Sequence, residues 1–291
     1  LPIGICWVNP AAAALPTGNR LKDPYAILRN SLPIQEQNLR ELQHTLEDTS
    51  DLVRGNRWPA INQAASKSLF LINTKQENIL QSLATEDKKK GERIILELKD
   101  SLETLNEDAS LKNKTDFIGT RRQALKEIGD LEGLLLPQDF PYIIPSEFDS
   151  LPRLLGRATV EIKTTQGNMY AVIDGYNAPL TGGAFIDLVK KGFYNGLPMN
   201  RAEEFFVLQT GDPKGSEIGY IDPNTKKERH VPLEIRAPGK KDTIYNQTFE
   251  ELGLYTETPV LPFATLGTLG WAHSEQALDD GSSQFFFFLY E

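Results

Sequence analysis

A guanidinium, aromatic rings and an amide follow one another closely in the segment MNRAEEFFVLQTGD, residues 199–212. Arg201 precedes Phe206 by five residues and Gln209 by eight. The apolar run between Phe205 and Leu208 has the composition of a buried strand. At this spacing the three side chains could line one apolar groove that holds a positive charge and a hydrogen-bonding amide. The alternative is a core strand with a surface arginine, and this segment alone leaves both open.

A second segment, GTLGWAHSEQALDDGSSQFFFFLY at residues 267–290, reads as an apolar strand, a polar loop and an aromatic strand. Together the two segments resemble the cyclophilin family of peptidyl-prolyl cis-trans isomerases. The family pattern F-H-R-x-x-x-x-F-M-x-Q-G-G-D is matched at Arg201, Phe206, Gln209, Gly211 and Asp212. The family elements M-A-N-x and G-S-Q-F-F reappear as Trp271-Ala272-His273 and Ser282-Ser283-Gln284-Phe285-Phe286.

The resemblance implies a reaction that needs no nucleophile, metal or cofactor. Prolyl isomerisation is slow because the peptide C–N bond has double-bond character, with a barrier of about 20 kcal/mol. By resemblance, Arg201 donates to the imide nitrogen and weakens that resonance, and Phe206 and Gln209 are the other catalytic residues. The resemblance assigns binding of the prolyl segment to Val207, Ala272, His273, Gln284 and Phe286.

Several positions depart from the family pattern. Val207 stands in place of methionine, Asn200 in place of histidine, and His273 in place of asparagine. Glu203 and Glu204 lie beside the arginine and could compete for it. We therefore keep three hypotheses: an isomerase or chaperone, a catalytically weak or inactive assembly scaffold that uses the same groove, and a purely structural subunit.

The composition is that of a globular protein. The 291 residues are 40% hydrophobic and 24% charged, with a net charge of −9, which argues against nucleic acid and anionic membrane as main partners. Cys6 is the one cysteine, so an intrachain disulfide is excluded. The three histidines, at positions 44, 230 and 273, form no metal-ligand motif, and we expect no metal site.

Residues 1–22 begin with LPIGICWVNPAAAALPTGN, an apolar stretch that ends in small residues. This pattern predicts the remnant of a signal peptide with cleavage near Ala14, followed by an N-terminal arm. The stretch is too short to span a membrane, and we expect no transmembrane segment. The alternative is an amphiphilic arm that is not removed. Cleavage would remove Cys6 and would imply export.

Residues 23–136 have helical periodicity, with Asp23 as a cap and Pro24, Pro33 and Pro59 as candidates for first-turn prolines. Narrow apolar stripes and short connections predict an all-α bundle of antiparallel helices. The stripes are Ile61, Ala65, Leu69, Ile72, Ile79 and Leu83, then Ile95, Leu98, Leu102, Leu105 and Ala109, then Phe117, Ala124, Ile128, Leu131 and Leu135.

Residues 137–156 form a proline-rich linker that is apolar and stiff, not polar and flexible. We expect it to lie against both domains. We also expect the bundle or the linker to cover part of the groove, because Phe140, Tyr142 and Phe148 must be buried. From residue 157 the period becomes two, and residues 157–291 are predicted to be a cyclophilin-like antiparallel β-barrel. The barrel is expected to be incomplete, because the family's last strands have no counterpart here.

The chain is thus predicted to have two domains, a helical bundle and a truncated cyclophilin-like barrel. The bundle, the segment DFPYIIPSEFDSLPRLLGRATV and the excursion YIDPNTKKERHVPLEI together resemble the multidomain cyclophilins of the thylakoid lumen. That resemblance implies residence in the thylakoid lumen and a role in assembling or maintaining photosystem II. The implied partners are proline-containing protein segments and lumenal subunits or loops of photosystem II.

Overall fold

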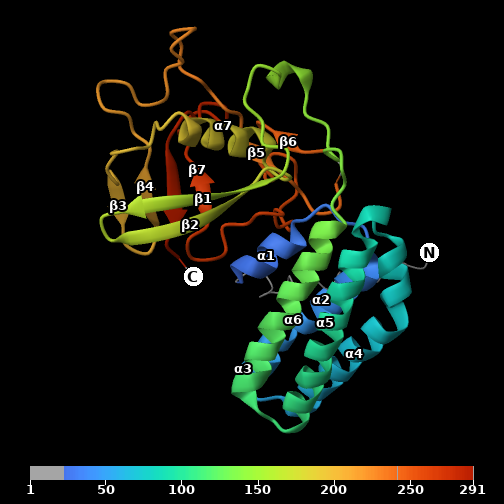
Figure 1. Cartoon of the computed structure of the whole chain (residues 1–291). Coiled ribbons are helices and arrows are strands. Elements are labelled where there is room, and N and C mark those ends of the chain that lie inside the picture. The colour runs from blue at the N-terminus through green and yellow to red at the C-terminus, as the bar shows by residue number, and fades with distance from the viewer. Residues whose placement is uncertain (1–22, 241, 291) are drawn as a thin grey trace, which may run out of the picture.

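The structure is a computed structural model that describes residues 23–240 and 242–290. The expected signal-peptide remnant at residues 1–22 lies outside the described residues, as does Cys6. A helical bundle lies beside a part that contains the strands (Figure 1). The helices of the bundle are α1 Pro24–Asn30, α2 Gln37–Glu47, α3 Thr49–Arg54, α4 Trp58–Gln81, α5 Lys88–Ser110 and α6 Lys114–Leu134, with the 3-10 helix η2 at Thr85–Asp87.

Side-chain caps decide where the first two helices begin. The Asp23 carboxylate caps α1 and Pro24 occupies its first turn, as the sequence predicts. The expectation for Pro33 is wrong, because this proline lies in the loop between α1 and α2. The start of α2 is fixed instead by Glu36, whose carboxylate accepts from the Leu39 amide. Proline fixes a backbone angle but supplies no acceptor, so the carboxylate determines the start of this helix.

The predicted apolar stripes meet in one core inside the bundle. Helices α5 and α6 pack along each other, α4 packs on α5, and α2 packs on α4. The Phe117 ring is fully buried and meets the Trp58 ring edge-on, with 6.4 Å between ring centroids. Fully buried residues from the three stripes include Ile61, Ile72, Leu98, Leu105 and Ile128. This core cluster contains residues of the bundle only.

A fragment of residues 23–136 is therefore expected to fold by itself. It should give a strongly helical circular dichroism spectrum and a cooperative thermal transition, because its core is internally complete. Helix α1 is the exception, since it also contacts the β-rich part, and its amides should exchange faster in the fragment than in the full chain. A spectrum typical of a disordered chain would show that the bundle needs the rest of the protein.

One carboxylate is buried in the bundle with half of its hydrogen-bonding capacity unused. The Glu132 side chain on α6 is fully buried, and one oxygen accepts from Arg40 Nη1 at 2.8 Å. Its other oxygen is buried without a partner. Burial raises the pKa of Glu132 to about 7, while Arg40 and Arg29 oppose that rise and Glu47 adds to it. The folded state therefore binds this proton more tightly than the unfolded chain does.

This pKa shift predicts a pH-dependent stability. Because the folded pKa of Glu132 lies above its unfolded value, the free energy of unfolding should fall as pH rises from about 4.5 to about 7, by on the order of 3 kcal/mol. Glu132→Gln should remove this contribution to the slope, which urea unfolding at pH 5, 6.5 and 8 would measure. The contribution of Glu234, whose pKa burial also raises to about 7, should remain. Glu97→Gln, on the exposed side of α5, is the matched control and should keep the wild-type slope. Parallel pH profiles for wild type and Glu132→Gln would contradict the prediction.

The proline-rich linker packs on one side of the β-rich part. Phe148 meets Tyr245 with 5.0 Å between ring centroids, and the Arg236 guanidinium lies 3.2 Å from the centre of the Tyr142 ring. Phe140 packs edge-on against Tyr142. The expectation that the linker covers the groove is wrong, because its aromatic residues find these partners instead and the Arg201 side chain stays about half exposed, at 47%.

The described residues of the β-rich part form three antiparallel sheets. Helix α7 lies beside the strands (Figure 1). Strands β3, β4, β8 and β7 form a four-stranded sheet in that order, while β1 pairs with β2 and β5 with β6. No closed barrel is formed by the described residues, and β3 and β7 are the edges of the four-stranded sheet. The elements are β1 Arg157–Thr164, β2 Gly167–Asp174, α7 Pro179–Lys190, β3 Arg201–Glu203, β4 Val207–Thr210, β5 Glu234–Ile235, β6 Ile244–Tyr245, β7 Leu269–Trp271 and β8 Phe285–Phe288, with the 3-10 helix η3 at Ser146–Phe148.

One face of the four-stranded sheet packs on α7 and on the β1–β2 hairpin. The Phe185 ring of α7 meets Phe285 edge-on, with 5.0 Å between ring centroids. Phe287 lies in the same cluster, with Val160 from β1 and Ile173 from β2. Because side chains alternate along a strand, the other face of this sheet is turned away from the core.

The bundle and the β-rich part are joined by a buried polar contact. Arg157 Nη2 and Nε donate to one oxygen of Asp174, at 2.7 and 2.9 Å, and Ser31 Oγ lies 3.1 Å from that oxygen. Asn177 Nδ2 donates to the Ser31 carbonyl at 2.8 Å, and Arg157 also donates to the Leu28 carbonyl at the end of α1. These bonds fix α1 against the end of β2.

Candidate functional site

The β3–β4 hairpin positions the arginine, the valine and the amide of the predicted groove. In its register Arg201 lies opposite Gln209, and Glu203 lies opposite Val207. Phe205 in the turn has a φ of 60°, the left-handed conformation that lets the chain reverse within three residues. Residues directly opposite in an antiparallel pair point to the same face. Arg201, Glu203, Val207 and Gln209 therefore share the face turned away from the core.

Strand β8 extends the same face with aromatic side chains. Phe286 lies opposite Gln209, and Phe288 lies opposite Val207. The Ala272 amide donates to the Gln284 carbonyl at 3.0 Å, so the loop after β7 continues alongside β8. The structure thus brings together residues that are far apart in the sequence, the hairpin and the residues around Gln284.

Arg201 has three neighbours on this face. Its Nε donates to Glu203 Oε1 at 2.7 Å, and its Nη1 lies 3.4 Å from Gln209 Oε1. Its guanidinium carbon lies 5.7 Å from the centre of the Phe206 ring, within range of a cation–π interaction. Phe206 is 49% exposed. A planar donor and an accessible ring therefore lie side by side, and both are open to a bound peptide.

A chain of hydrogen bonds holds the Gln209 amide in one orientation. Gln209 Nε2 donates to Gln284 Oε1 at 2.8 Å, and Gln284 Nε2 donates to the Ile218 carbonyl at 2.9 Å. Gly211 follows the strand at a φ of 94°, and an added Cβ would lie 2.5 Å from the Ser283 carbonyl oxygen. Only glycine fits this close approach of β4 to the start of β8, which keeps the two amides in register.

Two of the predicted binding residues lie differently from what the resemblance implies. Val207 is only 3% exposed, so it can form the floor of a groove but little of its wall. The His273 ring nitrogen Nδ1 lies 2.7 Å from the Ser274 carbonyl and 3.1 Å from the Ala277 carbonyl. Its imidazole is thus engaged with its own loop, and the structure gives it no contact with Arg201.

Sequence reasoning missed two aromatic residues next to the site. Phe263 packs against Phe286 and Phe288, with 5.5 and 6.0 Å between ring centroids, and is 53% exposed. The strand period of two could have identified Phe288, because it follows Phe286 by two residues on β8. Phe263 lies in an irregular loop, and no local pattern in the sequence predicts where it packs.

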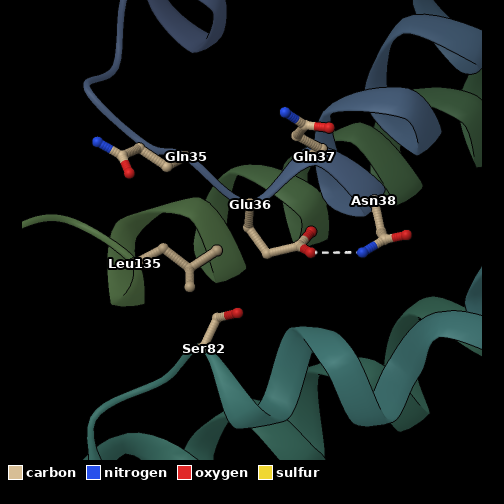
Figure 2. A pocket seen from close by; sticks show the side chains of 6 residues that line it. All are labelled: Gln35, Glu36, Gln37, Asn38, Ser82 and Leu135. Carbon is tan, nitrogen blue, oxygen red and sulfur yellow. Dashed lines mark hydrogen bonds between the residues drawn. The ribbon is translucent and has the colours of Figure 1, made fainter.

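Two polar hollows lie away from this face. The first, of about 390 Å³, opens where α2 begins and α4 and α6 end, and Figure 2 shows the Glu36 carboxylate hydrogen-bonded to the Asn38 amide in it. The second, of about 540 Å³, is bordered by Glu250, Glu251 and Glu275. Within residues 23–240 and 242–290, no group of three or more potential metal ligands comes together. None of the described helices has both the length and the apolar character needed to cross a bilayer.

Comparison with known families divides the chain into two matches. Residues 23–136 match the peptidyl-prolyl cis-trans isomerase CYP38-like, PsbQ-like domain. Residues 159–291 match the cyclophilin type peptidyl-prolyl cis-trans isomerase family.

Relatives align along nearly the whole chain. A protein of Synechocystis sp., named for a thylakoid lumen peptidyl-prolyl cis-trans isomerase, is 45% identical over 96% of this chain and 73% of its own length. The chloroplastic peptidyl-prolyl cis-trans isomerase CYP38 of Arabidopsis thaliana is 36% identical over 98% of this chain and 67% of its own length. The chloroplastic CYP37 of the same plant is 28% identical over 98% of this chain and 64% of its own length.

Proposed function

The chain belongs to the cyclophilin-type peptidyl-prolyl cis-trans isomerases, in the thylakoid-lumen group with a PsbQ-like helical domain, and from this we propose that it isomerises prolyl bonds in client proteins. The clients are extended, proline-containing protein segments that bind along the open face of the four-stranded sheet. Arg201, Phe206 and Gln209 carry the reaction. Ala272, Gln284 and Phe286 border the bound segment, Val207 lies beneath it, and His273 stays with its own loop.

The observation that carries this proposal is the placement of the Arg201 guanidinium beside Phe206 and Gln209. A guanidinium that donates to the imide nitrogen opposes resonance across the C–N bond, and a donor already in place needs no reorganisation during the reaction. The exposed ring of Phe206 supplies an apolar surface for the proline. Gln209, which contacts Gln284 and Arg201, is the amide that we assign to hydrogen bonding with the peptide backbone.

We further propose that the protein works in the thylakoid lumen, in the assembly or maintenance of photosystem II. The names of the Synechocystis and Arabidopsis relatives support a lumenal or chloroplast location. The resemblance to the multidomain cyclophilins of the thylakoid lumen, which includes the PsbQ-like match of residues 23–136, supports a role at photosystem II. Lumenal subunits or loops of photosystem II are then the clients.

An exchange measurement on the full chain tests the proposal. Two-dimensional NMR exchange spectroscopy of a short Xaa-Pro peptide reports cis–trans interconversion directly. Uncatalysed interconversion takes tens of seconds, which is too slow to give exchange peaks, and catalytic amounts of the protein should make it fast enough to give them. If the protein binds the peptide but the cis–trans exchange rate stays at the uncatalysed value, the isomerase proposal is wrong.

A second function is favoured by the Arg201–Glu203 ion pair and the buried Val207. A guanidinium engaged by a carboxylate is less available to an imide nitrogen, and a pocket floor without methionine offers less apolar contact. We therefore keep an assembly scaffold, which binds photosystem subunits through the bundle and the same face without turnover. Co-purification of lumenal photosystem segments with a protein that shows no isomerase activity would support the scaffold.

A further inference from the structure

The carboxylate of Glu203 is the closest charged group to the proposed catalytic arginine. The two side chains are two residues apart on β3, so they point to the same face, with 2.7 Å between Arg201 Nε and Glu203 Oε1. Arg201 Nη1 is held by Gln209, and no described residue accepts from Nη2. The arginine is thus restrained on two sides, one of them by a negative charge.

Both members of this pair are accessible, and exposed ion pairs are readily exchanged for other partners. The side chains of Arg201 and Glu203 are 47% and 50% exposed. Among the described residues, no second cation pairs with Glu203 within 4 Å. A cation delivered by a bound peptide would therefore meet this carboxylate without displacing any other side chain of the protein.

We propose that Glu203 makes the site selective for prolyl segments with a lysine or arginine next to the proline. A basic client side chain pairs with the Glu203 carboxylate and releases Arg201 Nε, so that the guanidinium can turn to the imide nitrogen. An acidic client side chain is repelled by the same carboxylate and leaves Arg201 restrained. This inference rests on the proposed isomerase function and names its substrate class.

Peptides that differ only beside the proline test this selectivity in the full chain. Three peptides in one neutral frame carry lysine, glutamine or glutamate on both sides of the proline, and NMR exchange spectroscopy gives kcat/KM for each. For wild type we expect the lysine peptide to exceed the glutamate peptide about fivefold or more, which corresponds to about 1 kcal/mol. In Glu203→Gln this ratio should approach one, and turnover of the glutamine peptide should rise.

Glu204→Gln is the matched control, because Glu204 is the next residue along the hairpin and takes no part in the Arg201 contacts. Its lysine-to-glutamate ratio should stay within about twofold of wild type. Equal loss of selectivity in both variants would show that the selectivity comes from the summed negative charge of the hairpin, and it would overturn the specific role of Glu203. A Glu203→Gln protein that keeps the wild-type ratio, or turns over the glutamine peptide more slowly, would overturn it as well.

Titration of the same peptides by NMR chemical shift separates this inference from the proposed function. Suppose that neither wild type nor Glu203→Gln catalyses exchange, but that wild type binds the lysine peptide more tightly than the glutamate peptide and the variant does not. The isomerase proposal then fails and the selectivity of Glu203 stands. If exchange is catalysed but the charge of the peptide affects neither binding nor turnover, the selectivity fails and the isomerase proposal stands.

Discussion

Replacing Arg201 with alanine is expected to lower kcat for prolyl isomerisation by about 100- to 1,000-fold, the loss typical of removing one preorganised donor from an active site. The side chain is half exposed on an edge strand, so its removal should leave the fold intact. Peptide binding should weaken much less, because the Phe206 ring and the Gln209 amide remain. NMR exchange spectroscopy with one neutral Xaa-Pro peptide measures both effects on the same sample.

Two further variants show whether the planar donor or only the charge matters. Arg201→Lys keeps the positive charge but loses the planar fork of the guanidinium, and we expect it to recover little of the lost rate. Arg54→Ala removes an exposed arginine of α3 in the bundle and should leave turnover unchanged. Activity in Arg201→Ala equal to that of wild type would mean that another group stabilises the twisted prolyl bond.

Replacing Asp174 with alanine is expected to destabilise the protein by about 3–5 kcal/mol, since it leaves a largely buried arginine without its carboxylate. Asp174 is 7% exposed and receives hydrogen bonds from Arg157, Ser31 and Asn177. The loss should fall on the β-rich part and on α1, because these are the elements that the contact joins. Urea unfolding followed by tryptophan fluorescence should therefore show a midpoint at a lower urea concentration than in wild type.

Asp130→Ala provides the matched control for this stability measurement. Asp130 pairs with Lys126 at 2.8 Å on the exposed surface of α6, and its removal should change the free energy of unfolding by about 0.5 kcal/mol or less. Comparable midpoints for Asp174→Ala and Asp130→Ala would contradict a stabilising role for the buried contact.

The helical half was predictable because its caps and apolar stripes depend on residues close together in the sequence. The Asp23 cap and the apolar stripes through Leu98 and Ile128 each depend on residues within a few turns, and the structure places them as the 3.6-residue period predicts. The prediction for Pro33 was wrong because proline occurs in loops as well as in the first turn of helices. The acceptor that caps α2 is the Glu36 carboxylate.

The candidate site was predictable in its residues but not in its contacts. The family pattern selected Arg201, Gln209 and Phe286, and the strand register brings them to one face. The rotamer of Glu203, the packing of Phe263 and the hydrogen bonds of His273 to its own loop depend on partners that no spacing in the sequence reveals. The linker was misplaced for the same reason, since its aromatic residues need a surface but the sequence does not say which one.

The contact between Ser31 and Asp174 also has a consequence for biogenesis. The two residues are 143 positions apart, so α1 cannot complete its hydrogen bonds until β2 has been synthesised. At about 5–20 residues per second this delay is on the order of 10 s. A helix of seven residues is not stable in isolation, so during that interval α1 depends on its bonds to α2, among them the 2.8 Å pair of Arg29 with Glu47. The first helix of the chain is therefore fixed to the β-rich part only after all the other helices of the bundle have been made.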